Sequence, residues 1–259
     1  MAPSERGGTP LLVLRKITTL LDAFTLERPV LSAAELREAS GLPASTVQRL
    51  VANLVDEGFL DRTERGYRIG VRVAYWAAAG SVGAEILDVT RPVLADLRDI
   101  TGETACLYQT SMDLRVCTAV AETRHSLRRP MRVGQAMPIH VGSAGRVILA
   151  WDDALARRVL AADLPSLTDA TITDRARLRE VLGQARADGF AITTGERESG
   201  ASGLSAPVFD PHRQVVGAIT VMGPSLRMPA DVCLGWIDHV VGAAERVTRM
   251  LGGRRPISG

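Results

Sequence analysis

Residues 32–54, SAAELREASGLPASTVQRLVANL, predict two short helices joined by a tight turn. Ser32 and Glu35 have the spacing of a capping box, in which the serine side chain accepts from the backbone amide three residues on and the glutamate reaches back. Gly41 and Pro43 then end the first helix, because glycine accepts a positive φ and proline cannot continue a helix.

The second helix of this pair, expected at residues 44–57, has one apolar stripe and one polar face. The stripe follows the i, i+3, i+4, i+7 spacing of a buried helix face and consists of Val47, Leu50, Val51 and Leu54. The side chains outside it can bond a base edge or a phosphate, and they are Ser45, Thr46, Gln48, Arg49 and Asn53. Two short helices with such an outer face predict a helix-turn-helix whose second helix enters the major groove of DNA.

Residues 60–69 alternate around an expected turn at Arg65-Gly66, which predicts a small hairpin, or wing, after the second helix. Its basic residues, Arg62, Arg65 and Arg68, are candidate DNA contacts. The alternative interpretation is a small helical subdomain whose polar residues only face solvent. Asp61 and Glu64 beside the wing arginines favour that alternative.

The rest of the chain predicts a second, larger domain. We expect a flexible tail at residues 1–10, a winged helix-turn-helix domain at 11–70, a linker helix at 71–83, an effector-binding and oligomerisation domain at 84–252, and a tail at 253–259. Helices are expected at residues 84–100, 143–150, 154–161, 175–187 and 229–251, and strands at 104–109, 116–121, 127–133, 191–194, 204–209 and 215–222. Because helices and strands do not alternate strictly, an α+β fold with an antiparallel sheet is favoured.

The composition excludes some classes of protein. The 259 residues are 46% hydrophobic and 23% charged, which is typical of globular proteins and excludes a wholly disordered chain. No apolar stretch reaches the length of a membrane span, and the N-terminal residues lack a secretory pattern, so we expect no membrane partner and a cytoplasmic location. The net charge of +2 does not by itself indicate a nucleic-acid partner.

Motifs for catalysis or metal binding are missing from the sequence. The three cysteines, Cys106, Cys117 and Cys233, are widely spaced and predict reduced structural thiols. No histidine pair has metal-ligand spacing, and the glycines around Ser143 and Ser202 miss the spacing of a nucleophile elbow. We therefore predict no catalytic residue, no metal and no cofactor. An enzyme that uses His140 or Ser143 stays as an alternative.

A ligand site is a better interpretation of the same glycines. Residues 140–146 bring a strand end to a helix start, where free amides and the helix dipole favour an anionic or strongly polar group. Ser143 can cap that helix and bond a ligand, although a plain cap without a ligand is an equal alternative. The polar loop 196–203 can wall the same pocket. A basic run fits either an acidic ligand or, as we favour, a solvated strand face: Arg124, Arg128, Arg129 and Arg132.

Together these residues resemble the IclR family of bacterial transcription regulators. The segment 41–50 is similar to the family's recognition helix, and 57–60 leads into its wing. Pro138-Ile-His140 followed by Gly145-Arg146 resembles the family's P-L-H…G-K segment, with arginine in the lysine position. Further similar segments lie at residues 101–104, 171–174, 189–191, 206–210 and 223–224.

The resemblance implies a winged-helix domain, a linker helix that helps form dimers, and a GAF-like domain that binds a small metabolite. The candidate effector contacts are Met131, Val133, Ser143, Ala144, Thr193, Gly203, Thr220 and Met222. Many members have an acidic residue at the position of Thr193, cysteine at Gly203, and serines at Thr220 and Met222. This departure favours a larger, partly apolar effector, such as an aromatic acid or derivative, over a small polar carboxylate.

The expected partners are therefore double-stranded operator DNA, a small-molecule effector and further copies of the chain, as a dimer or a dimer of dimers. A metabolic enzyme, or a ligand-binding adaptor with an accessory helical domain, is the competing hypothesis.

Overall fold

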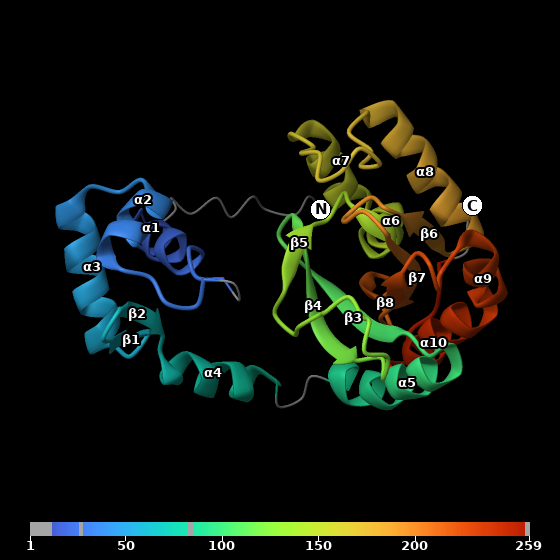
Figure 1. Cartoon of the computed structure of the whole chain (residues 1–259), viewed down its shortest axis with the longest axis horizontal. Helices are drawn as coiled ribbons and strands as arrows, with labels where there is room; N and C mark the ends of the chain where they lie inside the picture. Colours follow the sequence, from blue (N-terminus) through green and yellow to red (C-terminus); the bar gives the residue numbers. More distant parts are fainter. Residues whose placement is uncertain (1–11, 26–27, 82–84, 257–259) are drawn as a thin grey trace, which may run out of the picture. The chain divides into compact units, whose positions relative to one another are not determined.

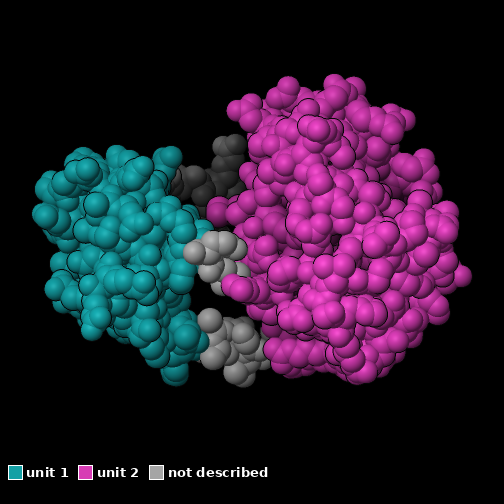
Figure 2. Space-filling view, viewed as in Figure 1, with its two compact units in different colours: residues 1–83 teal, residues 84–259 magenta. Residues whose placement is uncertain are grey.

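The computed structural model describes residues 12–25, 28–81 and 85–256. Contacts along the chain divide it into two compact units, residues 1–83 and 84–259, coloured teal and magenta in Figure 2. The expected tail at residues 1–10 and the last two residues of the expected linker helix lie outside the described residues.

The first unit contains the predicted helix-turn-helix. Its elements are α1 (Leu12–Leu21), α2 (Ala33–Ser40), α3 (Ala44–Asp56), β1 (Leu60–Thr63), β2 (Gly66–Ile69) and α4 (Val71–Ser81). The capping box is confirmed, because the Ser32 hydroxyl accepts from the Glu35 amide and the Glu35 carboxylate accepts from the Ser32 amide at 2.8 Å. The Ser32 amide and hydroxyl both donate to the Glu35 carboxylate at 2.8 Å, and these two hydrogen bonds lower the pKa of Glu35. Gly41 ends α2 with a φ of 65°.

The apolar stripe of α3 forms the centre of this unit's core. Val47, Leu50, Val51 and Leu54 are all buried. They cluster with leucines from α1, α2, the chain before α2 and β1, namely Leu20, Leu36, Leu31 and Leu60. The stripe therefore fixes the rotation of α3 about its own axis and leaves its polar side chains on the outer face.

The wing differs by one residue from its predicted turn. Thr63 pairs with Gly66, so Glu64 and Arg65 form the turn instead of Arg65-Gly66. The next residue, Tyr67, exchanges two backbone hydrogen bonds with Leu31, at 2.8 and 2.9 Å. Gly66 thus lies against the chain before α2 with a φ of 143°, and a Cβ there would be 2.3 Å from the Leu31 carbonyl oxygen.

Replacing Gly66 by alanine is expected to destabilise the first unit by about 1–3 kcal/mol, because the φ is unfavourable and the Cβ meets backbone that cannot move freely. Chemical denaturation measures the loss. Arg65→Ala, at the neighbouring exposed turn position, is the matched control and should change the free energy of unfolding by less than about 0.5 kcal/mol. Equal stability of the two variants would contradict the prediction.

The second unit is built on a six-stranded antiparallel sheet with the order β5-β4-β3-β8-β7-β6. The strands are β3 (Thr104–Ser111), β4 (Leu114–Ala121), β5 (Ala136–Pro138), β6 (Ala191–Thr194), β7 (Ala201–Phe209) and β8 (Val215–Pro224). The helices are α5 (Glu85–Thr101), α6 (Gly142–Trp151), α7 (Asp153–Ala161), α8 (Arg175–Asp188), α9 (Ala230–Gly235) and α10 (Ile237–Met250). This is the predicted α+β class with an antiparallel sheet.

Alternate residues of the central strands face two separate cores. Cys106 and Tyr108 of β3 belong to a core shared with α6, α7 and α8. Ala105 and Leu107, one residue away, belong to a core shared with α5, α9 and α10. The sheet therefore lies between two helical layers (Figure 1), and α6 packs against the half of the sheet formed by β8, β7 and β6.

Two predicted elements are wrong in this unit. Residues 127–133 are not a strand but an irregular segment, and the neighbouring strand is the short β5 instead; Pro130 lacks the amide that a strand ladder needs. The expected closing helix at 229–251 is two helices, α9 and α10, because Gly235 is a poor helix former and α9 ends there. Within the three described ranges, no helix combines the length and apolar character needed to cross a membrane.

Candidate functional site

The predicted recognition face lies on the outside of α3. Ser45, Gln48, Arg49 and Asn53 are exposed, and Thr46 is half-buried. The Asn53 side-chain amide donates to the Arg49 carbonyl at 2.8 Å. The Arg49 side chain has no ion pair or hydrogen bond with the described residues, so its guanidinium is available to a partner.

The wing arginines are also exposed, but their surroundings differ. Arg68 pairs with Asp61 at 3.3 Å, and the Arg62 guanidinium lies 5.8 Å from the centre of the Tyr67 ring. Arg65 is in the hairpin turn. In the sequence, acidic neighbours of the wing arginines weaken the case for DNA binding. For Asp61 this holds for Arg68, whose charge the ion pair partly neutralises, and less for the other two arginines.

A cavity in the second unit brings together five of the eight candidate effector contacts. Ser143, Thr193, Gly203, Thr220 and Met222 line it, from α6, β6, β7 and β8. Its volume is about 40 Å³. Ligand pockets typically have volumes of about 300–1,000 Å³, so residues at its wall must move to admit an aromatic molecule.

The other three candidates do not line this cavity. Ala144 is buried beside Ser143 in α6, and Met131 is buried in the core under the same helix. Val133 is 55% exposed in the irregular segment before β5. Their assignment as effector contacts has less geometric support than that of the other five.

Ser143 does not cap α6, contrary to the expectation. The helix begins one residue earlier, at Gly142, and its N-cap position is Val141, which has no capping side chain. The Ser143 hydroxyl instead bonds Ser205 at 2.8 Å, and Ser205 bonds Thr220 at 2.8 Å. Three hydroxyl groups thus run from α6 across β7 to β8 at the cavity.

The first amide of α6 is bound by a carboxylate of the protein itself. Glu196 accepts from the Gly142 amide at 3.0 Å and pairs with Arg146, and both side chains of this ion pair are 9% exposed. Residues 196–203 line the cavity, as expected, through Glu196, Arg197, Ala201, Ser202 and Gly203, of which the last three belong to β7 and not to a loop. The sequence predicts an anionic ligand group at the start of α6, and the carboxylate of Glu196 occupies that position.

Sequence reasoning missed two lining residues, Tyr108 and Arg115. Arg115 is 4% exposed, its guanidinium lies 4.8 Å from the centre of the Tyr108 ring, and its Nε has no hydrogen-bond partner among the residues that the structure describes. Burial lowers the pKa of Arg115 and raises that of Tyr108. Strand alternation could have found Arg115, since it lies two residues before the buried Cys117 on β4, but the predicted strand began at residue 116.

The basic run is mostly paired on the surface. Arg124 pairs with Asp99, Arg128 with Glu122, and Arg129 with Glu198. These residues lie in irregular chain and not on a strand face.

The three cysteines are buried and carry free thiols. No group of three potential metal ligands occurs within the described residues.

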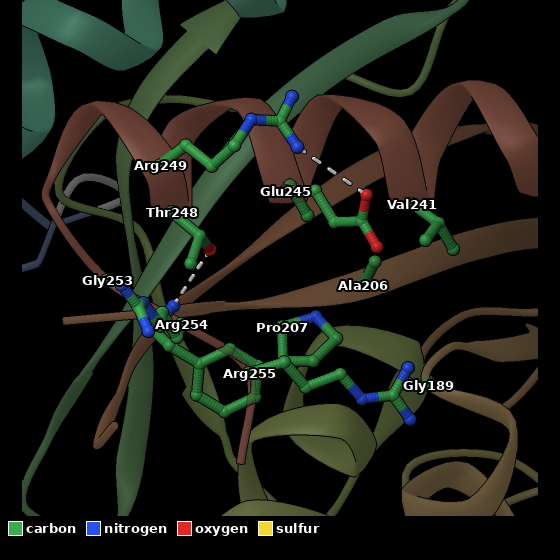
Figure 3. A pocket seen from close by; sticks show the side chains of 12 residues that line it. Gly189, Ala206, Pro207, Val241, Glu245, Thr248, Arg249, Gly253, Arg254 and Arg255 are labelled. Atoms are coloured by element: carbon green, nitrogen blue, oxygen red, sulfur yellow. Dashed lines mark hydrogen bonds and ion pairs between the residues drawn. The ribbon is translucent and has the colours of Figure 1, made fainter. Parts of the chain in front are cut away.

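A second cavity, of about 190 Å³, lies between β7, α10 and residues 253–255 (Figure 3). None of the candidate site residues lines it. Its charged side chains are at the exposed rim, where Arg249 pairs with Glu245 at 3.7 Å. The Thr248 hydroxyl accepts from the Phe209 amide at 3.1 Å and ties α10 to β7. The cavity lined by Ser143 therefore remains the candidate effector site.

Comparison with known proteins connects both units to one family. The model of the IclR helix-turn-helix domain matches residues 13–64, and that of the bacterial transcriptional regulator IclR C-terminal domain matches residues 80–249. The chain is 28% identical to the transcriptional repressor IclR of Escherichia coli over 98% of both proteins.

Solved structures of IclR-family proteins have the same fold as this chain. A putative IclR transcriptional regulator from a Silicibacter species superimposes with a TM-score of 0.86 at 30% identity, covering 94% of this chain and 98% of that one. An IclR homolog from Microbacterium hydrocarbonoxydans, complexed with 4-hydroxybenzoate, has a TM-score of 0.78 at 24% identity, covering 93% and 99%.

Proposed function

The chain belongs to the IclR family and is a DNA-binding transcriptional regulator, not an enzyme, and from this premise we propose which residues contact the operator and which hold the effector. The regulator acts in the cytoplasm, and a small molecule bound in the Ser143 cavity changes its affinity for operator DNA. The observation that carries the proposal is the polar outer face of α3 on a helix-turn-helix whose stripe of apolar residues is buried.

On DNA, Ser45, Thr46, Gln48 and Arg49 approach base edges, because a recognition helix presents its N-terminal half to the major groove. Asn53 lies further along the same face of α3 and contacts the sugar-phosphate backbone of the DNA. The wing arginines, Arg62, Arg65 and Arg68, bind phosphates or the minor groove. The exposure of these side chains supports this assignment, as does the Arg49 guanidinium, which has no partner among the described residues.

Replacing Arg49 by alanine is expected to weaken operator binding by about 1–3 kcal/mol and to relax the base preference at one position, as loss of a bidentate guanine contact does. Footprinting on the region upstream of the protein's own gene locates the operator, and binding to single-base operator variants measures the preference. Arg177→Ala, which removes an exposed arginine of α8, is the control. A uniform loss on all DNA sequences would make Arg49 a phosphate contact, and no footprint with or without ligand would oppose operator recognition there.

The effector is an aromatic acid or derivative. The cavity combines the hydroxyls of Ser143, Thr193 and Thr220 with the apolar side chain of Met222 and the ring of Tyr108. The structural neighbour complexed with 4-hydroxybenzoate has the same fold. A thermal-shift screen of aromatic and aliphatic acids, followed by footprinting with each compound that binds, tests this class. Stabilisation by aliphatic acids alone would contradict it.

The active form is a homo-oligomer, a dimer or a dimer of dimers. Each helix at the ends of the first unit exposes apolar side chains: Leu12, Val13 and Leu14 on α1, and Val71 and Tyr75 on α4. A second copy of the chain can cover them. Effector binding alters operator affinity if the DNA-competent and DNA-incompetent arrangements of the oligomer bind the effector with different affinity. In the sequence, α4 joins the first unit to the second. Sedimentation measures the assembly.

A further inference from the structure

We infer that Arg115 is the residue that selects the effector's negative charge, so that the Ser143 cavity takes an organic acid in preference to its neutral analogue. This inference rests on the proposed function, in which that cavity holds the effector. The sequence expectation assigned this anion to the free amides at the start of α6, whereas here the Arg115 guanidinium beside that helix start binds it.

Arg115 is a buried cation without an acidic partner. Its side chain is 4% exposed, no carboxylate lies within ion-pair distance among the described residues, and its Nε is unbonded. Its guanidinium lies over the Tyr108 ring, 4.8 Å from the ring centre. A buried guanidinium stays charged and is costly to bury without a compensating anion.

Several other polar and charged groups at this cavity are already engaged. Glu196 binds the Gly142 amide at the start of α6 and also pairs with Arg146. Arg197 lies 3.4 Å from a Glu198 oxygen. The Ser143 hydroxyl bonds Ser205. Arg115 is thus the one lining cation that the described residues leave unpaired, and it contributes a net positive charge.

The position of Arg115 suits a ligand in this cavity. Its Nη2 lies 3.2 Å from the point where a side chain at residue 142 would begin, and that residue is a glycine with a φ of 80°. The guanidinium therefore borders the start of α6, beside Ser143 and Thr193 on the cavity wall. Because a guanidinium can donate two parallel hydrogen bonds to a carboxylate, it distinguishes an acid from its amide.

The test compares benzoate and 4-hydroxybenzoate with benzamide and 4-hydroxybenzamide by calorimetric titration of the full chain. The wild type should bind the acids at least about 10-fold more tightly than the amides. In Arg115→Gln, acid affinity should fall roughly 10–100-fold while amide affinity changes less than about 3-fold. Arg115→Lys, which keeps the charge but not the fork, should retain part of the preference, and Arg177→Gln is the surface control.

Equal binding of acid and amide by the wild type overturns the inference, and so does an unchanged acid preference in Arg115→Gln. Either would leave the effector site itself in place. If no compound binds the wild type, the proposed aromatic class is wrong, and thermal unfolding of Arg115→Met decides the assignment of Arg115. A ligand-binding cation without a partner predicts an unfolding temperature at or above that of the wild type, whereas a clear decrease shows a structural role and overturns the inference.

Discussion

Replacing Glu196 by alanine should lower the free energy of unfolding by about 3–5 kcal/mol, the usual cost of removing one member of a buried ion pair. The change leaves the Arg146 guanidinium buried without its carboxylate and the Gly142 amide without its acceptor. Both groups lie in α6, which packs against β6, β7 and β8 of the sheet. Urea denaturation followed by circular dichroism measures the loss.

Glu198→Ala is the matched control for this prediction. Glu198 lies two residues away in the same loop, is 46% exposed and pairs with Arg129 on the surface. Exposed ion pairs contribute about 0–1 kcal/mol, so this variant should be nearly as stable as the wild type. The double variant Arg146→Met/Glu196→Gln should recover part of the loss, because it leaves no unpaired charge. Similar small losses in the two alanine variants would show that the Arg146–Glu196 pair does not hold α6.

Replacing Leu50 by alanine should destabilise the first unit by about 2–5 kcal/mol and abolish specific DNA binding. Leu50 is 6% exposed and belongs to the stripe that packs α3 against the leucines of α1 and α2. Because the second unit has its own two cores, it should stay folded. Amide hydrogen exchange resolved along the chain, combined with gel shifts, measures both effects.

Gln48→Ala separates folding from recognition in the same helix. Gln48 is exposed, so its loss should change stability by less than about 0.5 kcal/mol and leave α3 protected from exchange. Weaker operator binding by this variant would then report a lost contact. Retained protection of α3 in Leu50→Ala would show that the stripe is not what holds the recognition helix.

Local sequence patterns were enough to predict the helix-turn-helix and the mixed α+β class of the second unit. The capping box and the apolar stripe of α3 depend on residues three to seven positions apart, and such neighbours meet whatever the rest of the chain does. The polar loop 196–203 and the start of α6 could be assigned to one site for a similar reason, since each carries a local pattern of glycines and polar residues.

Only the tertiary structure decided which charges meet at the cavity. Arg146 and Glu196 are 50 residues apart in the sequence, and the strand order β4-β3-β8-β7 places Arg115 near residues from the far end of the chain. Whether an arginine is paired depends on the carboxylates that the fold brings within about 4 Å, and no sequence spacing reports that distance. The sequence therefore predicted where the candidate effector site lies, and the packing of α6 on the sheet decided that its first amide is bound by Glu196, while Arg115 has no acidic partner among the described residues.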